Sequence, residues 1–214
     1  MIALVDYGAG NLTSVRKALA AIGADAWTPS VPGELGRAHG IIVPGVGHFD
    51  STRALTDEWR TAIRTMVDDG SPLLGICVGL QWLFEGSDEA PETSGLCVFE
   101  GKCFNLGSSR PQDLKTSRPL KIPHVGWNSI ALPRRSRLMA GVKDGSQVYF
   151  THSYAAPVTD DAAATTEYGV TFSAAVERDN VSGVQFHPEK SGDVGLKILS
   201  NWLAHLSRRS SGGA

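Results

Sequence analysis

The sequence predicts an α/β fold with three layers, in which helices cover both faces of a mixed, mainly parallel sheet. Three short apolar runs, at residues 2–5, 40–43 and 73–76, are typical of parallel strands that are buried on both faces. A segment with the helical periodicity of apolar residues follows each run. Strands that alternate with helices in this way favour a parallel sheet.

The first predicted unit joins a strand at residues 2–5 to a helix with one apolar face. That face is made by Leu12, Val15, Leu19 and Ile22, and Gly23 follows as a C-cap. Between strand and helix, the loop at residues 6–11 contains two glycines. A dinucleotide-binding fingerprint would need a third glycine where Thr13 stands, so we exclude that motif. The loop is either a simple tight turn or a contact loop at the carboxyl edge of the sheet.

The second strand, at residues 40–43, runs into Pro44-Gly45-Val46-Gly47-His48. The helix that follows has Leu55, Trp59, Ile63 and Met66 on one face, and Gly70 closes it. The third strand, at residues 73–76, leads directly into a further helical pattern. These units supply the parallel part of the predicted sheet.

The second half of the chain changes to short strands separated by turns. We interpret 122–128 as a turn, 147–154 as an alternating strand, and 173–177 with 181–187 as a hairpin. The last helix has its apolar face at Ile198, Leu199, Trp202, Leu203 and Leu206. Residues 208–214 form a polar tail that we expect to be frayed. With no linker or repeat, residues 1–214 are expected to form a single domain.

Composition excludes several functional classes. The net charge of −2 gives no global reason to expect nucleic acid or an anionic membrane as a partner. No apolar run is long enough to span a bilayer, and the amino terminus lacks the features of a signal peptide. The cysteines, Cys77, Cys97 and Cys103, are odd in number and lack metal-ligand spacing, which fits free thiols in a reducing cytoplasm. We expect neither a metal nor an organic cofactor.

Cys77 occupies a position in the sequence that is typical of a catalytic nucleophile. Gly75-Ile76-Cys77-Val78-Gly79 has the Gly-x-Cys-x-Gly pattern of a nucleophile elbow, a strained strand-to-helix turn whose glycines prevent steric clash. The helix N-terminus favours the reactive thiolate, and the N–H of Val78 would face an oxyanion that forms on a carbonyl substrate. The alternative is a buried structural cysteine in a glycine-rich turn.

A base for this cysteine is predicted far downstream, at His187-Pro188-Glu189. Pro188 ends the strand where the imidazole emerges, and in extended chain Glu189 lies on the same side as His187. A carboxylate there would fix the tautomer of the ring and stabilise the imidazolium. The alternative for this motif is a strand-end histidine beside a solvated glutamate. His48, in the loop after the second strand, competes as the base.

Three other segments have open roles. The Gly45–Gly47 loop can approach a ligand closely or flip a peptide plane, which makes it a candidate second oxyanion donor. The acidic segment at residues 85–92 is mostly solvated, although one of its carboxylates can pair with a substrate ammonium. Residues 110–137 carry seven basic side chains and one acidic side chain. They form either a solvated loop or a face towards a phosphate-bearing molecule.

Taken together, three motifs resemble those of the triad-type (class I) glutamine amidotransferases: Pro44–Gly47, Gly75–Gln81 and Gln185–Ser191. Three further stretches, at residues 6–11, 122–128 and 149–154, are similar to the glutaminase subunits that serve imidazole glycerol phosphate synthases. The resemblance covers essentially the whole chain. Two positions depart from the commonest pattern: Val78, where leucine is usual, and Trp82 in the following turn.

The resemblance implies a nucleophile at Cys77, a base and acid at His187 and an orienting carboxylate at Glu189. It also implies a glutamine site. The residues placed around that glutamine are Gly47, Gln81, Glu89, Ser153 and Tyr154, and the oxyanion is expected on the N–H groups of Val78 and of Val46 or Gly47.

The implied partner is a (β/α)8-barrel cyclase subunit, which would form a heterodimer with this chain and receive the ammonia. The residues expected at that interface are Asn11, His124, Trp127 and Asn128, with Trp127 as the anchor because tryptophan is a leading hot-spot residue. Two rival hypotheses are a glutaminase for another synthase, making pyridoxal phosphate or aminodeoxychorismate, and a catalytically silent module that binds a barrel protein.

Overall fold

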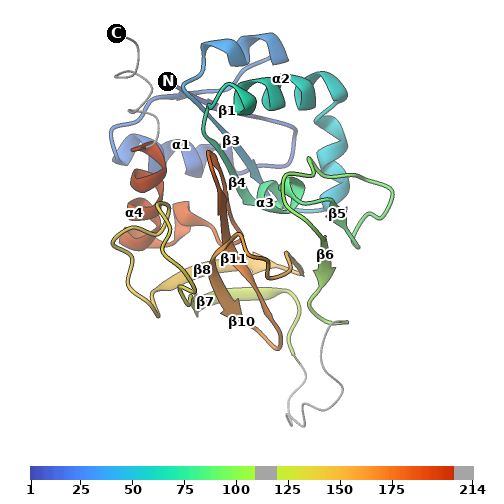
Figure 1. Cartoon of the computed structure of the whole chain (residues 1–214), viewed down its shortest axis with the longest axis vertical. Coiled ribbons are helices and arrows are strands. Elements are labelled where there is room, and N and C mark those ends of the chain that lie inside the picture. The colour runs from blue at the N-terminus through green and yellow to red at the C-terminus, as the bar shows by residue number, and fades with distance from the viewer. Residues whose placement is uncertain (109–119, 205–214) are drawn as a thin grey trace.

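The computed structural model describes residues 1–108 and 120–204, and it has a seven-stranded sheet at its centre (Figure 1). In spatial order the strands are β10 (Ala162–Glu167), β11 (Thr171–Arg178), β12 (Val181–Val184), β4 (Leu73–Cys77), β3 (Gly40–Gly45), β1 (Ile2–Leu4) and β2 (Ala26–Trp27). The five strands from β12 to β2 are parallel, whereas β11 pairs antiparallel with both of its neighbours. The predicted α/β fold with a mixed, mainly parallel sheet is confirmed.

Helices cover both faces of this sheet (Figure 1). On one face α1 (Leu12–Ala21) contacts α4 (Gly192–Leu203), and on the other α3 (Val78–Leu83) packs over β3, β4 and β12. Helix α2 (Asp57–Asp68) lies on the same side as α3 (Figure 1). Arg60 of α2 donates a hydrogen bond of 2.7 Å to the carbonyl oxygen of Gly95, which lies twelve residues beyond the end of α3. The three layers are therefore those that the alternation of strands and helices predicts.

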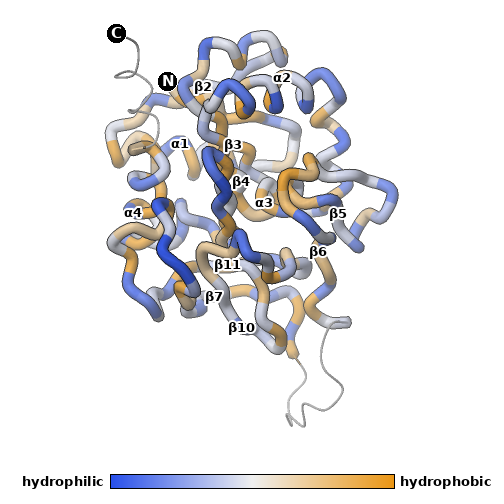
Figure 2. Tube along the Cα trace, viewed as in Figure 1, coloured by the Kyte–Doolittle hydropathy of each residue, from blue (hydrophilic) through white to orange (hydrophobic). Residues whose placement is uncertain are grey.

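The register of the inner strands decides which residues meet at the carboxyl edge of the sheet. Gly45 at the end of β3 pairs with Cys77 at the end of β4, and Val184 at the end of β12 pairs with Ile76. These strands are fully buried, and Figure 2 shows β3 and β4 as predominantly hydrophobic. Because the three strands are parallel neighbours, the loops that follow them lie at one edge of the sheet.

Two smaller sheets extend this edge. One joins β5 (Gly86–Ser87), β6 (Lys102–Asn105) and β9 (Tyr154–Ala155), and the other pairs β7 (His124–Ser129) antiparallel with β8 (Gln147–His152). The expected turn at residues 122–128 is therefore wrong, because residues from His124 onwards form a strand. The expected strand at 147–154 is interrupted at Ser153, which separates β8 from β9.

Other boundaries also differ from the sequence prediction. Strands β2 and β10 were not predicted, and a 3₁₀ helix (Phe49–Ala54) precedes α2, which leaves Leu55 buried at the corner between them. Strand β12 ends three residues before His187. The tail at residues 208–214 and Leu206 lie outside the described residues. Within 1–108 and 120–204, no helix has both the length and the apolarity needed to cross a membrane.

Candidate functional site

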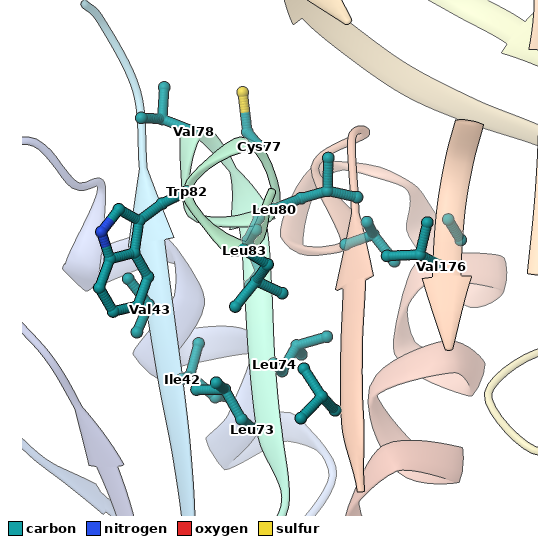
Figure 3. Packing of buried hydrophobic residues seen from close by; sticks show 14 of the residues in the cluster. Ile42, Val43, Leu73, Leu74, Cys77, Val78, Leu80, Trp82, Leu83 and Val176 are labelled. Atoms are coloured by element: carbon teal, nitrogen blue, oxygen red, sulfur yellow. The ribbon is translucent and has the colours of Figure 1, made fainter. Parts of the chain in front are cut away.

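Cys77 lies on a strained turn between β4 and α3. Its backbone has φ 55° and ψ −107°, which a residue with a side chain rarely adopts. A Cβ on Gly79 would come within 1.8 Å of the Val43 carbonyl oxygen, and one on Gly75 within 2.5 Å of the Gly79 oxygen. The glycines on either side of the cysteine are thus required by close backbone contact, as the elbow motif predicts. Figure 3 shows the sulfur pointing away from the buried side chains of β4.

His187 and Glu189 form a buried pair beside this turn. The Nδ1 atom of His187 lies 2.8 Å from Oε1 of Glu189, and both side chains are almost fully buried. The pairing agrees with the predicted orienting carboxylate, but the predicted route is wrong. Residues Pro188–Lys190 form a 3₁₀ turn rather than extended chain, and this turn brings the carboxylate back onto the ring. Ser191 holds the turn by donating a hydrogen bond of 2.7 Å to the His187 carbonyl oxygen.

The charge state of His187 depends on Cys77 and Glu189. Burial by itself lowers the pKa of His187, but the interactions with Cys77 and Glu189 outweigh burial and raise the pKa to about 10. At neutral pH the ring therefore favours the imidazolium form when Cys77 is a thiolate. A cysteine nucleophile, with a histidine whose ring is oriented by a glutamate, is suited to attack on a carbonyl carbon and to protonation of the leaving group.

A pocket of about 170 Å³ opens directly over Cys77. It is lined by Gly47, Cys77, Val78, Gln81, Glu89, Thr151, His152, Ser153 and Tyr154. Of the residues that the resemblance places around a substrate, Gly47, Val78, Gln81, Glu89, Ser153 and Tyr154 are in this set, and Val46 is not. Thr151 and His152 also line the pocket and were not predicted as site residues. The sequence signal that could have identified them is the alternating pattern of β8, because that strand ends at His152, next to the predicted site residue Ser153.

Two polar side chains in the pocket have fixed orientations. Glu89 accepts a hydrogen bond of 2.8 Å from the backbone N–H of Phe49. Gln81 donates from Nε2 to the Tyr154 carbonyl oxygen at 2.8 Å, and its buried Oε1 has no partner among the described residues. The pocket thus contains one carboxylate and one unused amide oxygen, both of which accept hydrogen bonds and suit an ammonium group or an amide N–H.

The Gly45–Gly47 loop approaches the elbow closely, but one of its N–H groups is already bonded. A Cβ on Gly45 would lie 2.1 Å from the hydroxyl oxygen of Tyr7 and 2.8 Å from Cβ of Val78. The N–H of Val46 donates a hydrogen bond of 2.6 Å to the carbonyl oxygen of Ala9. In this conformation Val46 cannot act as the expected oxyanion donor. Gly47, at φ +100°, is in a conformation that favours glycine.

His48, the competing base, is exposed and serves another purpose. Its Nδ1 accepts a hydrogen bond of 3.1 Å from the N–H of Asp50 and so caps the 3₁₀ helix that precedes α2. Trp82, the unusual residue after the elbow, is fully buried, and the guanidinium carbon of Arg60 lies 5.6 Å from the centre of its ring. We therefore assign a structural role to both residues.

The residues expected at an interface do not share one face. In strand β7, Val125 and Trp127 are 55% and 57% exposed, whereas His124 is 3% exposed. The expectation that His124 belongs to the exposed face is wrong, because alternate residues of a strand point to opposite sides. Asn128, partly exposed, donates to the Glu167 carbonyl oxygen at 2.9 Å. Asn11 is the N-cap of α1, where it accepts a hydrogen bond from Ser14.

His124 instead pairs with His152 beneath the pocket. Nδ1 of His124 lies 3.0 Å from Nε2 of His152, and Nδ1 of His152 lies 2.8 Å from the Tyr154 carbonyl oxygen. Burial lowers the pKa of His124 to about 4, and burial, together with the charges of His124 and His187, lowers that of His152 to about 3. Both rings are neutral at physiological pH, so the pair supports the wall of the pocket without adding charge.

Two arginines in the described part of the basic stretch are tied to the protein itself. Arg134 donates to the backbone carbonyl oxygens of Ala162 and Asp161, and Arg137 contacts the buried carboxylate of Glu177 at 3.2 Å. Residues 109–119 lie outside the described residues. Within the described ranges, no three His, Cys, Asp or Glu side chains are grouped as a metal site would require.

Comparison with known proteins agrees with this geometry. The family model "Glutamine amidotransferase class-I" matches residues 3–206. The chain is 44% identical over 216 residues to the imidazole glycerol phosphate synthase subunit HisH of Geobacillus kaustophilus, covering 99% of this chain and all of the relative. It is 42% identical over 204 residues to the same subunit of Methanothermobacter thermautotrophicus, covering 95% of this chain and 98% of the relative.

A solved structure, that of PurLQS from Thermotoga maritima, has a similar fold. The TM-score is 0.72 at 17% sequence identity, and the match covers 96% of this chain and 98% of that chain. At this level of identity the likeness is evidence for the fold alone.

Proposed function

The chain belongs to the class I glutamine amidotransferase family, and from this premise we propose how its residues act. It is a glutaminase subunit of the HisH type, which hydrolyses L-glutamine to glutamate and ammonia for imidazole glycerol phosphate synthase in histidine biosynthesis. The observation that supports a catalytic rather than a silent site is the position of Cys77. Its strained turn opens into a pocket of about 170 Å³ beside the buried His187–Glu189 pair.

Cys77 is the proposed nucleophile. Its thiolate attacks the side-chain amide carbon of glutamine, and the negative charge that develops on the oxygen is stabilised by the N–H of Val78. The His187 imidazolium then protonates the nitrogen as the carbon–nitrogen bond breaks, which releases ammonia and leaves a thioester. His187 next takes a proton from water, and the resulting attack on the thioester releases glutamate and restores the thiolate.

The pocket provides the groups that a free amino acid requires. Glu89 is the proposed partner of the substrate ammonium, and the unused Oε1 of Gln81 is a further acceptor. Ser153 and Tyr154 also line the pocket, as does Gly47 of the Gly45–Gly47 loop. Because the His124–His152 pair is neutral, it provides no cation that would compete with the substrate ammonium for Glu89.

We expect Glu189→Gln to lower glutamine turnover by about 10²-fold and to move the alkaline limb of the pH profile to lower pH. Glu189 is one of the groups that raise the pKa of His187 to about 10 in the wild type. Without the carboxylate, the imidazolium loses its proton at lower pH. The acid that protonates the leaving nitrogen is then lost at a lower pH than in the wild type. Initial rates across neutral and alkaline pH measure both effects. The exposed Glu92→Gln is the matched control, and an unchanged alkaline limb in Glu189→Gln would contradict the assigned role.

The proposed partner is a (β/α)8-barrel cyclase subunit that receives the ammonia. The HisH relatives are subunits of a synthase, and this chain has an exposed apolar pair, Val125 and Trp127, on a strand next to the pocket wall. Asn11 and Asn128 are further proposed contacts because both are partly exposed. His124 is proposed to act from beneath this surface rather than as a direct contact.

We expect Trp127→Ala to weaken association with the cyclase by about 30-fold, the effect of a hot-spot residue worth about 2 kcal/mol. The indole is 57% exposed in the isolated chain, so the substitution removes contact area without opening the core. Titration of the cyclase against labelled protein gives the affinity. Val158→Ala, at an apolar side chain that is 49% exposed outside β7, is the control. Unchanged binding and activation in Trp127→Ala would remove this residue from the proposed interface.

A glutaminase assay, with and without a candidate cyclase and its nucleotide ligand, tests the function as a whole. Stimulation by this cyclase, with transfer of ammonia to its ligand, separates the proposal from a role in making pyridoxal phosphate or aminodeoxychorismate. Covalent capture of Cys77 by a glutamine-mimicking electrophile separates it from a silent binding module. Absence of both glutamine turnover and capture in the assembled complex would contradict the proposed activity.

A further inference from the structure

A fully buried glutamine, Gln185, lies between the strand end of β12 and the proposed base. It is 0% exposed and stands two residues before His187, and its backbone N–H donates to the Ala174 carbonyl oxygen at 2.8 Å. The proposed reaction gives this side chain no role. A buried primary amide is costly unless its polar atoms have partners, so the partners of Gln185 are informative.

The neighbours of Gln185 fix the direction of its amide. The carbonyl oxygen of Tyr154 can only accept, so the nitrogen of Gln81 must face it, at 2.8 Å. The same nitrogen of Gln81 donates to Oε1 of Gln185 at 3.2 Å. With its oxygen bound to Gln81, Gln185 directs Nε2 towards Sγ of Cys77, at 3.6 Å. A reversed amide would place two N–H groups of the glutamine pair against each other.

Besides His187, whose pKa Cys77 raises, the sulfur has two hydrogen-bond partners, and these prefer opposite protonation states. The Thr151 carbonyl oxygen, 3.9 Å from Sγ, can only accept, so it pairs with a neutral S–H. The Gln185 amide can donate to the sulfur, and a donor interacts more strongly with an anion than with a neutral acceptor. The contact with Gln185 therefore favours the thiolate over the thiol.

We propose that Gln185 is a further catalytic residue, whose side-chain N–H stabilises the Cys77 thiolate and holds its sulfur towards the pocket. The same side chain anchors Gln81, which leaves Oε1 of Gln81 free to accept from a substrate. This inference rests on the proposed function, because it assigns Gln185 to the nucleophile of that reaction. The contact itself exists independently of the substrate, which allows a separate test.

The test follows alkylation of Cys77 by iodoacetamide as a function of pH in the isolated full chain. Mass spectrometry of the Cys77 peptide separates this thiol from the exposed Cys97. In Gln185→Met and Gln185→Leu we expect the midpoint of the profile to rise by about one pH unit and alkylation at neutral pH to fall about tenfold. Gln147→Met, at an exposed glutamine, is the matched control and should follow the wild-type profile. Profiles of both Gln185 variants that superimpose on the wild type would overturn the proposal.

A second measurement needs no change at Gln185 and therefore does not depend on whether its variants fold. In wild-type protein with ¹⁵N-labelled glutamine, the side-chain N–H resonances of Gln185 should shift with the same pH midpoint as Cys77 alkylation. Cys77→Ala should abolish that shift. Gln185 resonances that do not respond to ionisation of Cys77 would contradict the contact. Neither measurement uses glutamine as substrate. A wild-type complex without glutaminase activity would therefore contradict the proposed function, but it would not contradict the contact between Gln185 and Cys77.

Discussion

Replacing Cys77 with alanine is expected to lower glutamine hydrolysis by at least about 10⁴-fold, because no other group can form the thioester and triad members act as a unit. The fold should survive. Alanine keeps the Cβ and therefore the same backbone strain at φ 55°, and the sulfur points away from the buried side chains (Figure 3). Glutamate release, measured in the assembled complex, gives the size of the loss.

Two controls make the outcome of Cys77→Ala specific. Cys97→Ala changes an exposed free thiol and should leave turnover unaltered. Ammonium salt, supplied directly to the complex, should restore product formation by the Cys77→Ala variant, since the cyclase then no longer needs glutamine. Residual glutamine turnover above a few per cent would exclude Cys77 as nucleophile, and failure of ammonium to restore product would give Cys77 a further role.

The parts of the site that lie close in sequence were predictable from local chemistry. The elbow follows from two glycines and a cysteine after an apolar strand, and its glycines do contact neighbouring backbone. The positions of Cys77 and His187 relative to each other follow from parallel pairing, because β4 and β12 are adjacent and both lead to the same edge. The resemblance to a family added the residues expected around the substrate, which, apart from Val46, line one cavity.

Other features depend on tertiary contacts that no local pattern encodes. Residues 122–128 contain proline, glycine and asparagine, which favour a turn, yet pairing with β8 makes a strand from His124 onwards. That strand sends His124 inwards and Trp127 outwards. The alanine-rich β10 has low strand propensity and exists through its pairing with β11. Gln185 opens one of the motifs that carry the resemblance, but the sequence gave its side chain no role, because that role depends on Gln81, which is far away in sequence.

The Gly45–Gly47 loop beside the pocket points to control of activity by the partner. A glutaminase that released ammonia into water would waste glutamine, and here Val46 directs its N–H to Ala9 at 2.6 Å instead of towards the pocket. Glycine on both sides of Val46 allows the peptide plane to turn over at low strain. Ala9 belongs to the same loop as Asn11, a proposed interface residue. Contact of the cyclase with this loop could therefore move Ala9 and break its hydrogen bond with the Val46 N–H.

We expect the isolated chain to hydrolyse glutamine slowly and the cyclase with its nucleotide ligand to raise turnover by about 10²–10³-fold, the effect of gaining one oxyanion donor. Replacing Val46 with its α-hydroxy acid, which deletes the N–H and keeps the side chain, tests the donor directly. This backbone ester should bring the stimulated rate close to the basal rate while the complex still assembles. The same replacement at Gly47 is the matched control that distinguishes the two candidate donors.

Three results would contradict this mechanism of control. Full turnover by the isolated chain would show that the Val46–Ala9 hydrogen bond does not restrain activity. Full stimulation of the Val46 ester, with loss only in the Gly47 ester, would assign the donor to Gly47 instead. The ester at Val46 also lacks the hydrogen bond to Ala9. If the glutaminase rate of that isolated variant rose, the hydrogen bond would restrain activity in some way other than by withholding the Val46 N–H from the oxyanion. A basal rate that stays low, together with lost stimulation, is the result that requires the Val46 N–H itself to turn towards the substrate.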